Sequence, residues 1–194
     1  MQEKIKEFLG AKTIGSKIIF KEELESTQTE IKKLVEKGIE NGTMIVTNYQ
    51  TKGMGTHDRK WFSEKGKNIC FSFVIYPKCK VQGLDGITVD IAKCMIEAIY
   101  SVVGKKLDIK KPNDIVYNGK KVGGILTQIV SAGEKVKCLI IGIGINVNQI
   151  AFPDEISNIA TSLKKEFGKE FSREKIIAEF CNEFEKYCIK REII

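Results

Sequence analysis

The spacing of apolar residues separates helical segments from extended ones along the chain. A stripe of apolar residues at helical spacing predicts a helix over residues 27 to about 41, begun by a Thr27–Glu30 capping box and ended by Asn41-Gly42. A second helical pattern covers about residues 85–103 and closes at Gly104. A third begins near Ser172 and places aromatic and aliphatic residues on one face. These three helices are the expected partners of a sheet.

The extended segments are rich in β-branched residues and are joined partly by hairpins. Runs at 43–49, 68–76, 106–110 and 135–148 predict strands, and Asn118-Gly119 predicts a two-residue turn between two more. We therefore expect an α+β fold, with a mixed, largely antiparallel sheet packed against helices. No repeat or linker divides the sequence, so residues 1–194 are predicted to form a single domain.

The amino-acid composition is ordinary for a soluble globular protein. The chain has 194 residues, 42% hydrophobic and 29% charged, and its 32 basic and 25 acidic residues give a net charge of +7. Because the basic residues are scattered among acidic ones, we expect a solvated surface and no DNA partner. No apolar run approaches the roughly 20 residues of a membrane helix, and the N-terminus lacks the features of a signal peptide. A cytoplasmic location without membrane contact is expected.

The cysteines indicate a reduced protein. Six are present and none forms a C-x-x-C pair, while the single histidine, His57, has no cysteine or histidine at metal-ligand spacing. Most of the cysteines lie in apolar runs, where the thiol behaves as a small hydrophobic group. No bound metal site is predicted from the protein ligands alone.

Three polar, glycine-containing segments are not explained by core packing. The first is the loop 49–61, in which Gly53 and Gly55 free the backbone, Arg59 offers a forked charge and Trp61 a flat ring. The second is Lys-Lys-Pro-Asn-Asp at 110–114, followed by Lys-Lys-Val-Gly-Gly at 120–124. These residue types suit a phosphate or a carboxylate, although a mobile surface loop and a plain hairpin are the alternative interpretations.

The third segment is Gly-Ile-Gly-Ile-Asn-Val-Asn at 142–148. Alternation of glycine with isoleucine leaves one face of the strand without side chains and opens a groove there. Asn146 then offers a donor and an acceptor at the end of the strand.

In combination, these motifs resemble the catalytic domain of the biotin protein ligase family. Glu-Ser-Thr-Gln at 25–28, the Gly-x-Gly…Arg-Lys-Trp loop, Lys-x-Pro-Asn-Asp, Lys121 before Gly-Gly-Ile-Leu, and Gly-Ile-Asn-Val-Asn recur in this order. The likeness extends from about residue 20 to 165. It implies an enzyme that uses ATP and Mg²⁺ to activate biotin and then transfers it to a lysine of a biotin carboxyl carrier protein domain of a biotin-dependent carboxylase.

The resemblance also implies roles for individual residues. The biotin-binding set would be Ser26, Thr27, Gln28, Gln50, Met54, Gly55, Thr56, Lys121 and Gly124. The ATP-binding set would be Arg59, Trp61, Asn113, Asp114 and Asn146. Lys121, Arg59 and Asp114 would act in catalysis, with Lys121 holding the biotin carboxylate and the phosphoryl oxygen.

The sequence departs from the family at several points. Arginine is common where this chain has Met54 and Thr56, and tryptophan is usual at Lys111. We also expect no N-terminal helix-turn-helix domain and no small C-terminal β-barrel. Family members often pair through sheet edges, and the resemblance leaves a homodimer open.

Two other functions compete with biotin ligation. The first is lipoate or octanoate transfer by the same fold. Thr27-Gln28 and the Lys-x-Pro-Asn-Asp turn favour biotin over these acids. The second is non-catalytic binding of biotin or a nucleotide. The presence of Lys121, Asn113 and Asp114 favours an enzyme instead.

Overall fold

A computed structural model describes residues 1–56 and 59–194. Its central element is a seven-stranded sheet in the order β1-β2-β3-β7-β6-β5-β4. Only β1 and β2 are parallel to each other, and the remaining neighbours are antiparallel. The strands are β1 (Ile18–Leu24), β2 (Met44–Gln50), β3 (Ile69–Ile75), β4 (Asp108–Lys110), β5 (Asp114–Tyr117), β6 (Lys120–Ala132) and β7 (Lys135–Ile145).

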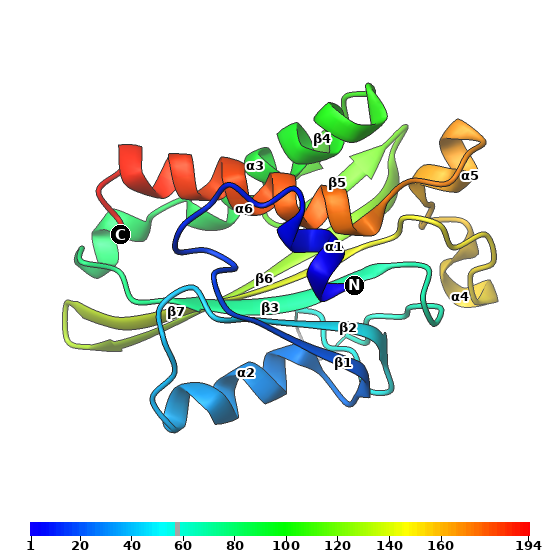
Figure 1. Ribbon diagram of the computed structural model, residues 1–194. Coiled ribbons are helices and arrows are strands. Elements are labelled where there is room, and N and C mark those ends of the chain that lie inside the picture. Colours follow the sequence, from blue (N-terminus) through cyan, green and yellow to red (C-terminus); the bar gives the residue numbers. More distant parts are fainter. Residues whose placement is uncertain (57–58) are drawn as a thin grey trace.

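Helices cover both faces of this sheet (Figure 1). Two long helices and α1 lie on one face, α2 lies on the other, and α4 and α5 stand at one end of the sheet. The expected α+β fold, a mixed and largely antiparallel sheet packed against helices, is confirmed. The helices are α1 (Gln2–Lys6), α2 (Thr27–Glu36), the 3₁₀ turn η1 (Val81–Leu84), α3 (Ile87–Val103), α4 (Asp154–Ser157), α5 (Leu163–Phe167) and α6 (Arg173–Lys190).

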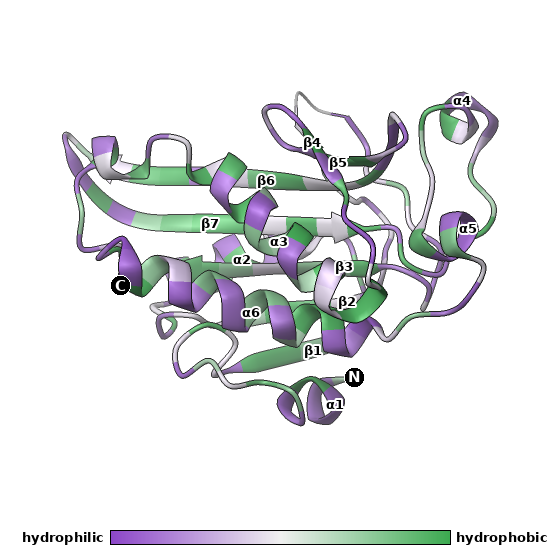
Figure 2. Ribbon diagram, turned by 90° about the horizontal axis from the view of Figure 1, so that it is seen from above, coloured by the Kyte–Doolittle hydropathy of each residue, from purple (hydrophilic) through white to green (hydrophobic). Residues whose placement is uncertain are grey.

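The main core lies between the sheet and the pair α3 and α6. Strand side chains alternate between faces, so Ile141, Ile143 and Ile145 of β7 point into this core together with Phe71 and Phe73 of β3. Figure 2 shows α3 and α6 lying across the apolar strands. Burial of this many large side chains fixes the register of the sheet, because a shift by one residue would expose all of them.

The opposite face has a smaller core that extends over only part of the sheet. There α2 packs Ile31 against Ile45, Val74, Cys138 and Ile140. Further along β7 the same face carries Gly142 and Gly144, which have no side chains to fill the space above the sheet. The small core therefore gives way to a space next to the start of α2.

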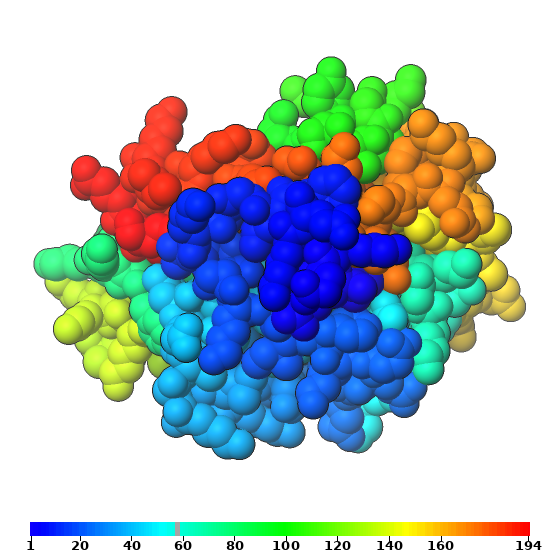
Figure 3. Space-filling model, in the orientation of Figure 1, coloured from blue at the N-terminus to red at the C-terminus, as the bar shows by residue number. Residues whose placement is uncertain are grey.

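The N-terminal segment is attached to the long C-terminal helix. Glu185 of α6 accepts hydrogen bonds from the backbone N–H groups of Lys12, Thr13 and Ile14, at 2.6, 2.7 and 2.8 Å. Asn182, one turn earlier, accepts from Gly10 at 2.7 Å. In Figure 3 the N-terminal residues, in blue, lie beside this helix, in orange and red. The buried carboxylate satisfies three backbone donors that the loop leaves unpaired.

Most predicted elements occur within one to three residues of their expected bounds. The turn at Asn118-Gly119 has φ of 48° and 78°, the positive values that a two-residue hairpin turn requires. The helix expected over 27–41 is shorter, because Gly38 adopts φ 76° and the helix ends at Glu36. The capping box is wrong: Ser26 occupies the N-cap, and the Thr27 hydroxyl donates to Gln50 instead.

Candidate functional site

A cavity of about 350 Å³ lies above the glycine-containing end of the sheet, beside the start of α2. Its volume falls in the range of small-molecule sites. Every residue predicted for the site lines it: Ser26, Thr27, Gln28, Gln50, Met54, Gly55, Thr56, Arg59, Trp61, Asn113, Asp114, Lys121, Gly124 and Asn146. Residues from five separate segments of the sequence therefore converge on one space, and the roles assigned to them stay predictions.

Glycines form the floor of the cavity. Gly124 of β6 pairs with Gly144 of β7, and Gly142 lies two residues along the same strand. A Cβ atom at Gly144 would come within 2.5 Å of the Trp61 ring, and one at Gly142 within 2.4 Å of Gln28 Oε1. The groove predicted from the glycine–isoleucine alternation is thus confirmed, and side chains of Trp61 and Gln28 lie directly against its floor.

One end of the cavity is a buried network of polar side chains, which we call the buried end (Ser26, Thr27, Gln28, Gln50 and Ser72). The backbone N–H and the hydroxyl of Thr27 both donate to Gln50 Oε1, at 2.8 and 3.1 Å. The Ser72 hydroxyl lies 2.8 Å from Thr27 Oγ1 and 3.0 Å from Gln28 Oε1. All five side chains are at most 9% exposed, and hydrogen bonds link four of them, Thr27, Gln28, Gln50 and Ser72, to one another.

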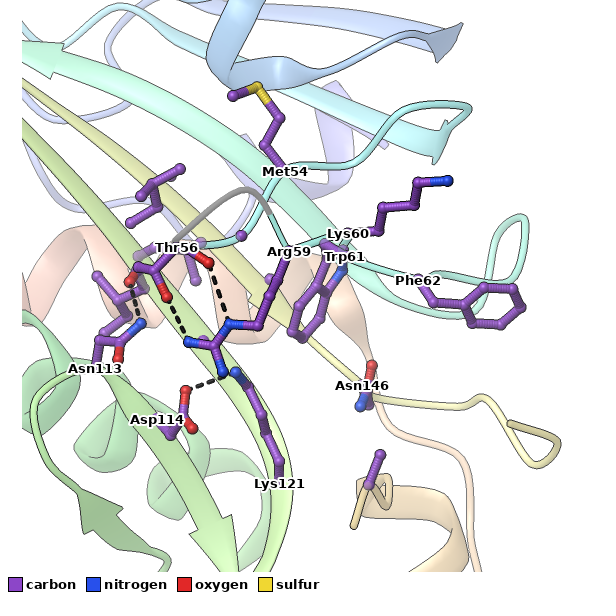
Figure 4. Close-up of a pocket in the computed structure, with 18 of the residues that line it drawn as sticks. Met54, Thr56, Arg59, Lys60, Trp61, Phe62, Asn113, Asp114, Lys121 and Asn146 are labelled. Carbon is purple, nitrogen blue, oxygen red and sulfur yellow. Dashed lines mark hydrogen bonds and ion pairs between the residues drawn. The ribbon is translucent and has the colours of Figure 1, made fainter. Parts of the chain in front are cut away.

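The centre of the cavity holds an ion pair. Lys121 Nζ lies 2.6 Å from Asp114 Oδ1, and the two side chains face each other in Figure 4. The Lys121 backbone is bonded on its other side to the segment after α4, with its N–H donating to Ile159 and its carbonyl accepting from Thr161. The ammonium group lies 5.9 Å from the centre of the Trp61 ring. Lys121 is therefore held at the cavity centre while its side chain stays partly exposed.

The other end, which we call the exposed end (Met54, Thr56, Arg59, Lys60, Trp61 and Phe62), is formed by the loop between β2 and β3. Arg59 is exposed and donates through Nε to the Thr56 carbonyl at 3.1 Å and through Nη2 to the Thr56 hydroxyl at 2.8 Å. Met54 and Phe62 are 44% and 47% exposed. His57 and Asp58, and with them part of the predicted loop 49–61, lie outside the described residues.

The two glycines of the loop, Gly53 and Gly55, have different surroundings. A Cβ atom at Gly53 would lie 2.4 Å from the Trp61 carbonyl oxygen, and Trp61 N–H donates to the Gly53 carbonyl at 2.9 Å. Gly53 therefore allows the two arms of the loop to pack closely. Gly55 lines the cavity itself, and its place beside the expected ligand stays a prediction.

Several buried polar atoms along the cavity have no hydrogen-bond partner within the described chain. They include Ser26 Oγ at the buried end and both Trp61 Nε1 and Asn146 Oδ1 toward the exposed end. An unpaired buried polar atom costs about 1–3 kcal/mol, so native proteins rarely leave several together. Their placement around one cavity indicates that a ligand with both donors and acceptors completes them.

A second hydrogen-bond network, centred on Gln149, was not predicted from the sequence. Gln149 is fully buried, and its Oε1 accepts from the Glu64 N–H at 3.1 Å and from Asn68 Nδ2. Its Nε2 donates to the Ala151 carbonyl at 2.7 Å. These bonds tie the end of the β2–β3 loop to the segment that carries Phe152, Ile156 and Ile159, which form the outer wall.

One thiol lies close to the site. Burial raises the pKa of the Cys70 thiol, on the strand beneath Trp61, to about 11, so this group is neutral and poorly nucleophilic.

Over residues 1–56 and 59–194, no group of three His, Cys, Asp or Glu side chains is placed to hold a metal ion. Within the same ranges no helix is long and apolar enough to cross a membrane.

Comparisons with known proteins agree on one family. The model of the biotin/lipoate A/B protein ligase family matches residues 20–146. The bifunctional ligase/repressor BirA of Bacillus spizizenii is 37% identical over 180 residues, which are 92% of this chain and 55% of that protein. The biotin–[acetyl-CoA-carboxylase] ligase of Paracoccus denitrificans is 30% identical over 125 residues, covering 63% of this chain and 51% of that protein. The chain thus spans about half the length of the curated relatives it matches.

Solved structures of biotin protein ligases share the fold. The enzyme from Aquifex aeolicus, in complex with biotin and ATP, aligns with a TM-score of 0.80 and 32% identity, over 91% of this chain and 72% of that one. The enzyme from Leishmania major, in complex with biotinyl-5-AMP, aligns with a TM-score of 0.71 and 25% identity, over 90% and 75%.

Proposed function

Because the chain belongs to the biotin/lipoate A/B protein ligase family, we propose that it is an ATP-dependent ligase that activates biotin as biotinyl-5'-AMP. It then transfers the biotinyl group to a lysine of a biotin carboxyl carrier protein domain. The observation that carries this proposal is one cavity with a polar, buried end and a lysine–carboxylate pair at its centre. The first suits the ureido head of biotin and the second its carboxylate.

At the buried end, the residues proposed to bind biotin offer a set of directed donors and acceptors. Thr27, Gln28, Gln50 and Ser72 are linked by hydrogen bonds, and Ser26 Oγ has no partner in the described chain. A ureido ring has two N–H donors and one carbonyl acceptor and can complete such a set. The dithiolane ring of lipoate has neither, and would leave these buried groups unpaired, which sites of this kind reject strongly. Biotin is therefore favoured over lipoate.

In the proposed first step, a biotin carboxylate oxygen attacks the α-phosphorus of ATP and pyrophosphate leaves. Lys121, at the cavity centre, binds the carboxylate and then the phosphoryl oxygen, while Asp114 holds its ammonium group in place. A fixed positive charge at the site of developing negative charge is often the largest catalytic contribution. Arg59 adds a second cation from the exposed end. Met54, Gly55 and Thr56 line the space above the acyl chain, and Gly124 lets it pass close to the sheet.

The nucleotide is proposed to bind between Trp61 and the segment after β7. The Trp61 ring offers a flat face, and Asn146 Oδ1 and Trp61 Nε1 offer buried polar atoms without partners in the described residues. Asn113, whose amide donates to the Ile125 carbonyl at 3.1 Å, positions the turn that carries Asp114. The oxygens of Asp114 and Asn146 are ligands of the type that Mg²⁺ prefers, and they would hold the ion that neutralises phosphate charge when ATP is bound.

In the proposed second step, the amine of the carrier lysine attacks the acyl carbon, the bond to AMP breaks and the amine loses a proton. Lys60 and Lys110 line the cavity mouth, which suits an acidic carrier surface. The cytoplasmic location, the lack of a DNA partner and the single-domain organisation of residues 1–194 stay predictions.

We also propose that two copies of the chain pair through β6. Strand β5 reaches only as far as Gly124, and beyond it no strand within the described residues pairs with the outer side of β6. Ile129 and Val130 on this segment are 41% and 44% exposed. Sedimentation velocity should show a dimer that Ile129→Lys weakens, and a monomer at micromolar concentration would contradict the pairing.

A pyrophosphate-release assay tests the central proposal. Biotin with ATP should release pyrophosphate, and addition of a carrier domain should give a mass increase of one biotinyl group on one lysine. Lipoate should support neither reaction at a comparable rate. Equal release with lipoate would transfer the assignment to lipoate ligation, and binding of biotin without release would indicate a non-catalytic binding protein.

A further inference from the structure

Gln149, shortly after the end of β7, is bonded to two walls of the cavity but is not among the residues that line it. It is fully buried, and its Oε1 accepts from the Glu64 N–H at 3.1 Å and from Asn68 Nδ2. Its Nε2 donates to the Ala151 carbonyl at 2.7 Å. A backbone N–H only donates and a backbone carbonyl only accepts, so these partners allow one orientation of the Gln149 amide. The Asn68 amide is fixed in the same way, because its Oδ1 accepts from the Val147 N–H at 3.1 Å.

On the loop side, Gln149 holds the arm 61–64, which carries Trp61. At the start of the arm, the Trp61 N–H donates to the Gly53 carbonyl at 2.9 Å, and at its end the Glu64 N–H donates to Gln149. The arm is therefore attached at both ends. The indole ring that it carries lies over the glycine floor, and its Nε1 has no partner in the described chain.

On the other side, Gln149 holds the start of the outer wall. Within the described chain, residues 152–158 form hydrogen bonds only with one another and with the two residues that follow them. Before this segment, Ala151 is bonded to Gln149, and after it the Ile159 carbonyl accepts from the Lys121 N–H at 2.8 Å. The position of the outer wall therefore depends on these two anchors.

We infer that Gln149 is a positioning residue that sets the width of the space between Trp61 and the outer wall. This inference rests on the proposed function, in which the nucleotide occupies that space. The buried atoms without a partner there, Trp61 Nε1 and Asn146 Oδ1, lie on the two segments that Gln149 joins. Loss of its bonds moves these segments apart and weakens binding of the nucleotide. The buried end shares no hydrogen bond with Gln149 in the described chain and keeps its affinity for biotin.

Gln149→Met tests this, because it keeps the approximate length of the side chain and removes its three hydrogen bonds. The KM for ATP should rise at least about tenfold, since a displacement on the order of 1 Å can cost about 10²-fold. Turnover at saturating ATP, and the dissociation constant of biotin without nucleotide, should each stay within about threefold, as when binding of one substrate alone is lost. Gln149→Asn, one methylene shorter, cannot bridge Glu64 and Ala151 and provides the comparison if the methionine variant does not fold.

Asn182 provides a matched control, because it makes contacts of the same kind in a part of the chain that does not line the cavity. Its Oδ1 accepts from the N–H groups of Gly10 and Ala11, at 2.7 and 3.0 Å, and its Nδ2 donates to the Phe8 carbonyl at 3.1 Å. Asn182→Leu should lower stability and leave the constants for ATP and biotin unchanged. Circular dichroism defines a temperature at which both variants are folded and can be compared.

Fluorescence reports the position of the arm directly, because Trp61 is the only tryptophan in the chain. Acrylamide should quench the emission more strongly in Gln149→Met than in the unmodified chain. In Asn182→Leu the quenching should not change.

An unchanged KM for ATP in Gln149→Met, or unchanged quenching of Trp61, would overturn the inference. Equal losses for ATP and biotin would do the same, and so would a similar rise in KM in Asn182→Leu, because loss of stability alone would then explain the effect. If the unmodified chain forms the adenylate, these results remove this inference alone. An unmodified chain that forms no adenylate overturns the proposed function as well.

Discussion

The two ends of the cavity are built in opposite ways. At the buried end, Thr27, Gln50 and Ser72 come from a helix and two strands and are bonded to one another. At the exposed end, the Arg59 side chain donates hydrogen bonds to Thr56 of the same loop, and Met54 and Phe62 are 44% and 47% exposed. Rigid elements suit recognition of a fixed head group, whereas a loop with few contacts can move around a nucleotide that enters and leaves.

The central lysine joins the two ends, and its removal should have the largest effect. Lys121→Ala should lower the rate of adenylate formation about 10²–10³-fold, because a charge directed at the reacting phosphate is lost. The partly exposed Asp114 can be hydrated, so the fold should persist. Lys120→Ala removes the same charge at an exposed neighbouring position and should leave the rate unchanged. Near-normal adenylation by Lys121→Ala, with an unchanged circular dichroism spectrum, would disprove its role.

Added positive charge at the exposed end should slow the release of the adenylate from the enzyme. Met54 and Thr56 line the cavity but supply no cation. Arginine at both positions should slow release of biotinyl-5'-AMP into a trap at least tenfold, because each charge-assisted hydrogen bond contributes about 1.5–3 kcal/mol. The double variant also removes the Thr56 hydroxyl that Arg59 contacts, so Thr56→Val is the matched control. Release at the unmodified rate would show that loop charge does not control retention.

A change at the buried end should affect both stability and affinity for biotin. Gln50→Leu leaves the Thr27 N–H and hydroxyl without their acceptor, and should lower the free energy of unfolding by about 1–3 kcal/mol. Affinity for biotin should fall about tenfold, with a smaller effect on the KM for ATP. Denaturant titration and calorimetry measure the two quantities. A variant as stable as the unmodified chain would mean that the network is not a fixed one.

The matching change at the exposed end should leave stability intact. Arg59 is exposed, so Arg59→Ala should change the free energy of unfolding by less than about 0.5 kcal/mol. The KM for ATP should rise or turnover should fall, while binding of biotin alone stays the same. If biotin alone lost most of its affinity, Arg59 would belong with the residues that bind the acid.

The same contrast explains what was predictable from the sequence. Glycine, Lys121, Asn146 and the loop residues occur in local motifs, and all the predicted residues line one cavity. Ser72, Gln128 and Gln149 were not predicted. Each lies in an ordinary strand or turn, and these side chains form hydrogen bonds with residues 44 to 100 positions away in the sequence. A local sequence pattern cannot predict which distant residues form hydrogen bonds with each other.

Secondary structure shows a similar division. Strand β1, with the sequence Ile-Ile-Phe-Lys-Glu-Glu-Leu, was not predicted, because its charged half does not alternate with apolar residues. It is nevertheless paired in parallel with β2 at the edge of the sheet, where charged side chains are tolerated. The end of α2 at Glu36 depends on the positive φ of Gly38, although an apolar residue at helical spacing, Ile39, follows it.

Calorimetric titration of biotin in the absence of nucleotide tests the contrast between the ends most directly. Biotin should bind the nucleotide-free chain at one site, because the buried end is already formed by bonds within the protein. Gln50→Leu should weaken that binding about tenfold, and Arg59→Ala should leave it unchanged. Binding of biotin that requires ATP, or an equal loss in the two variants, would contradict a preformed head-group site with a separate nucleotide end.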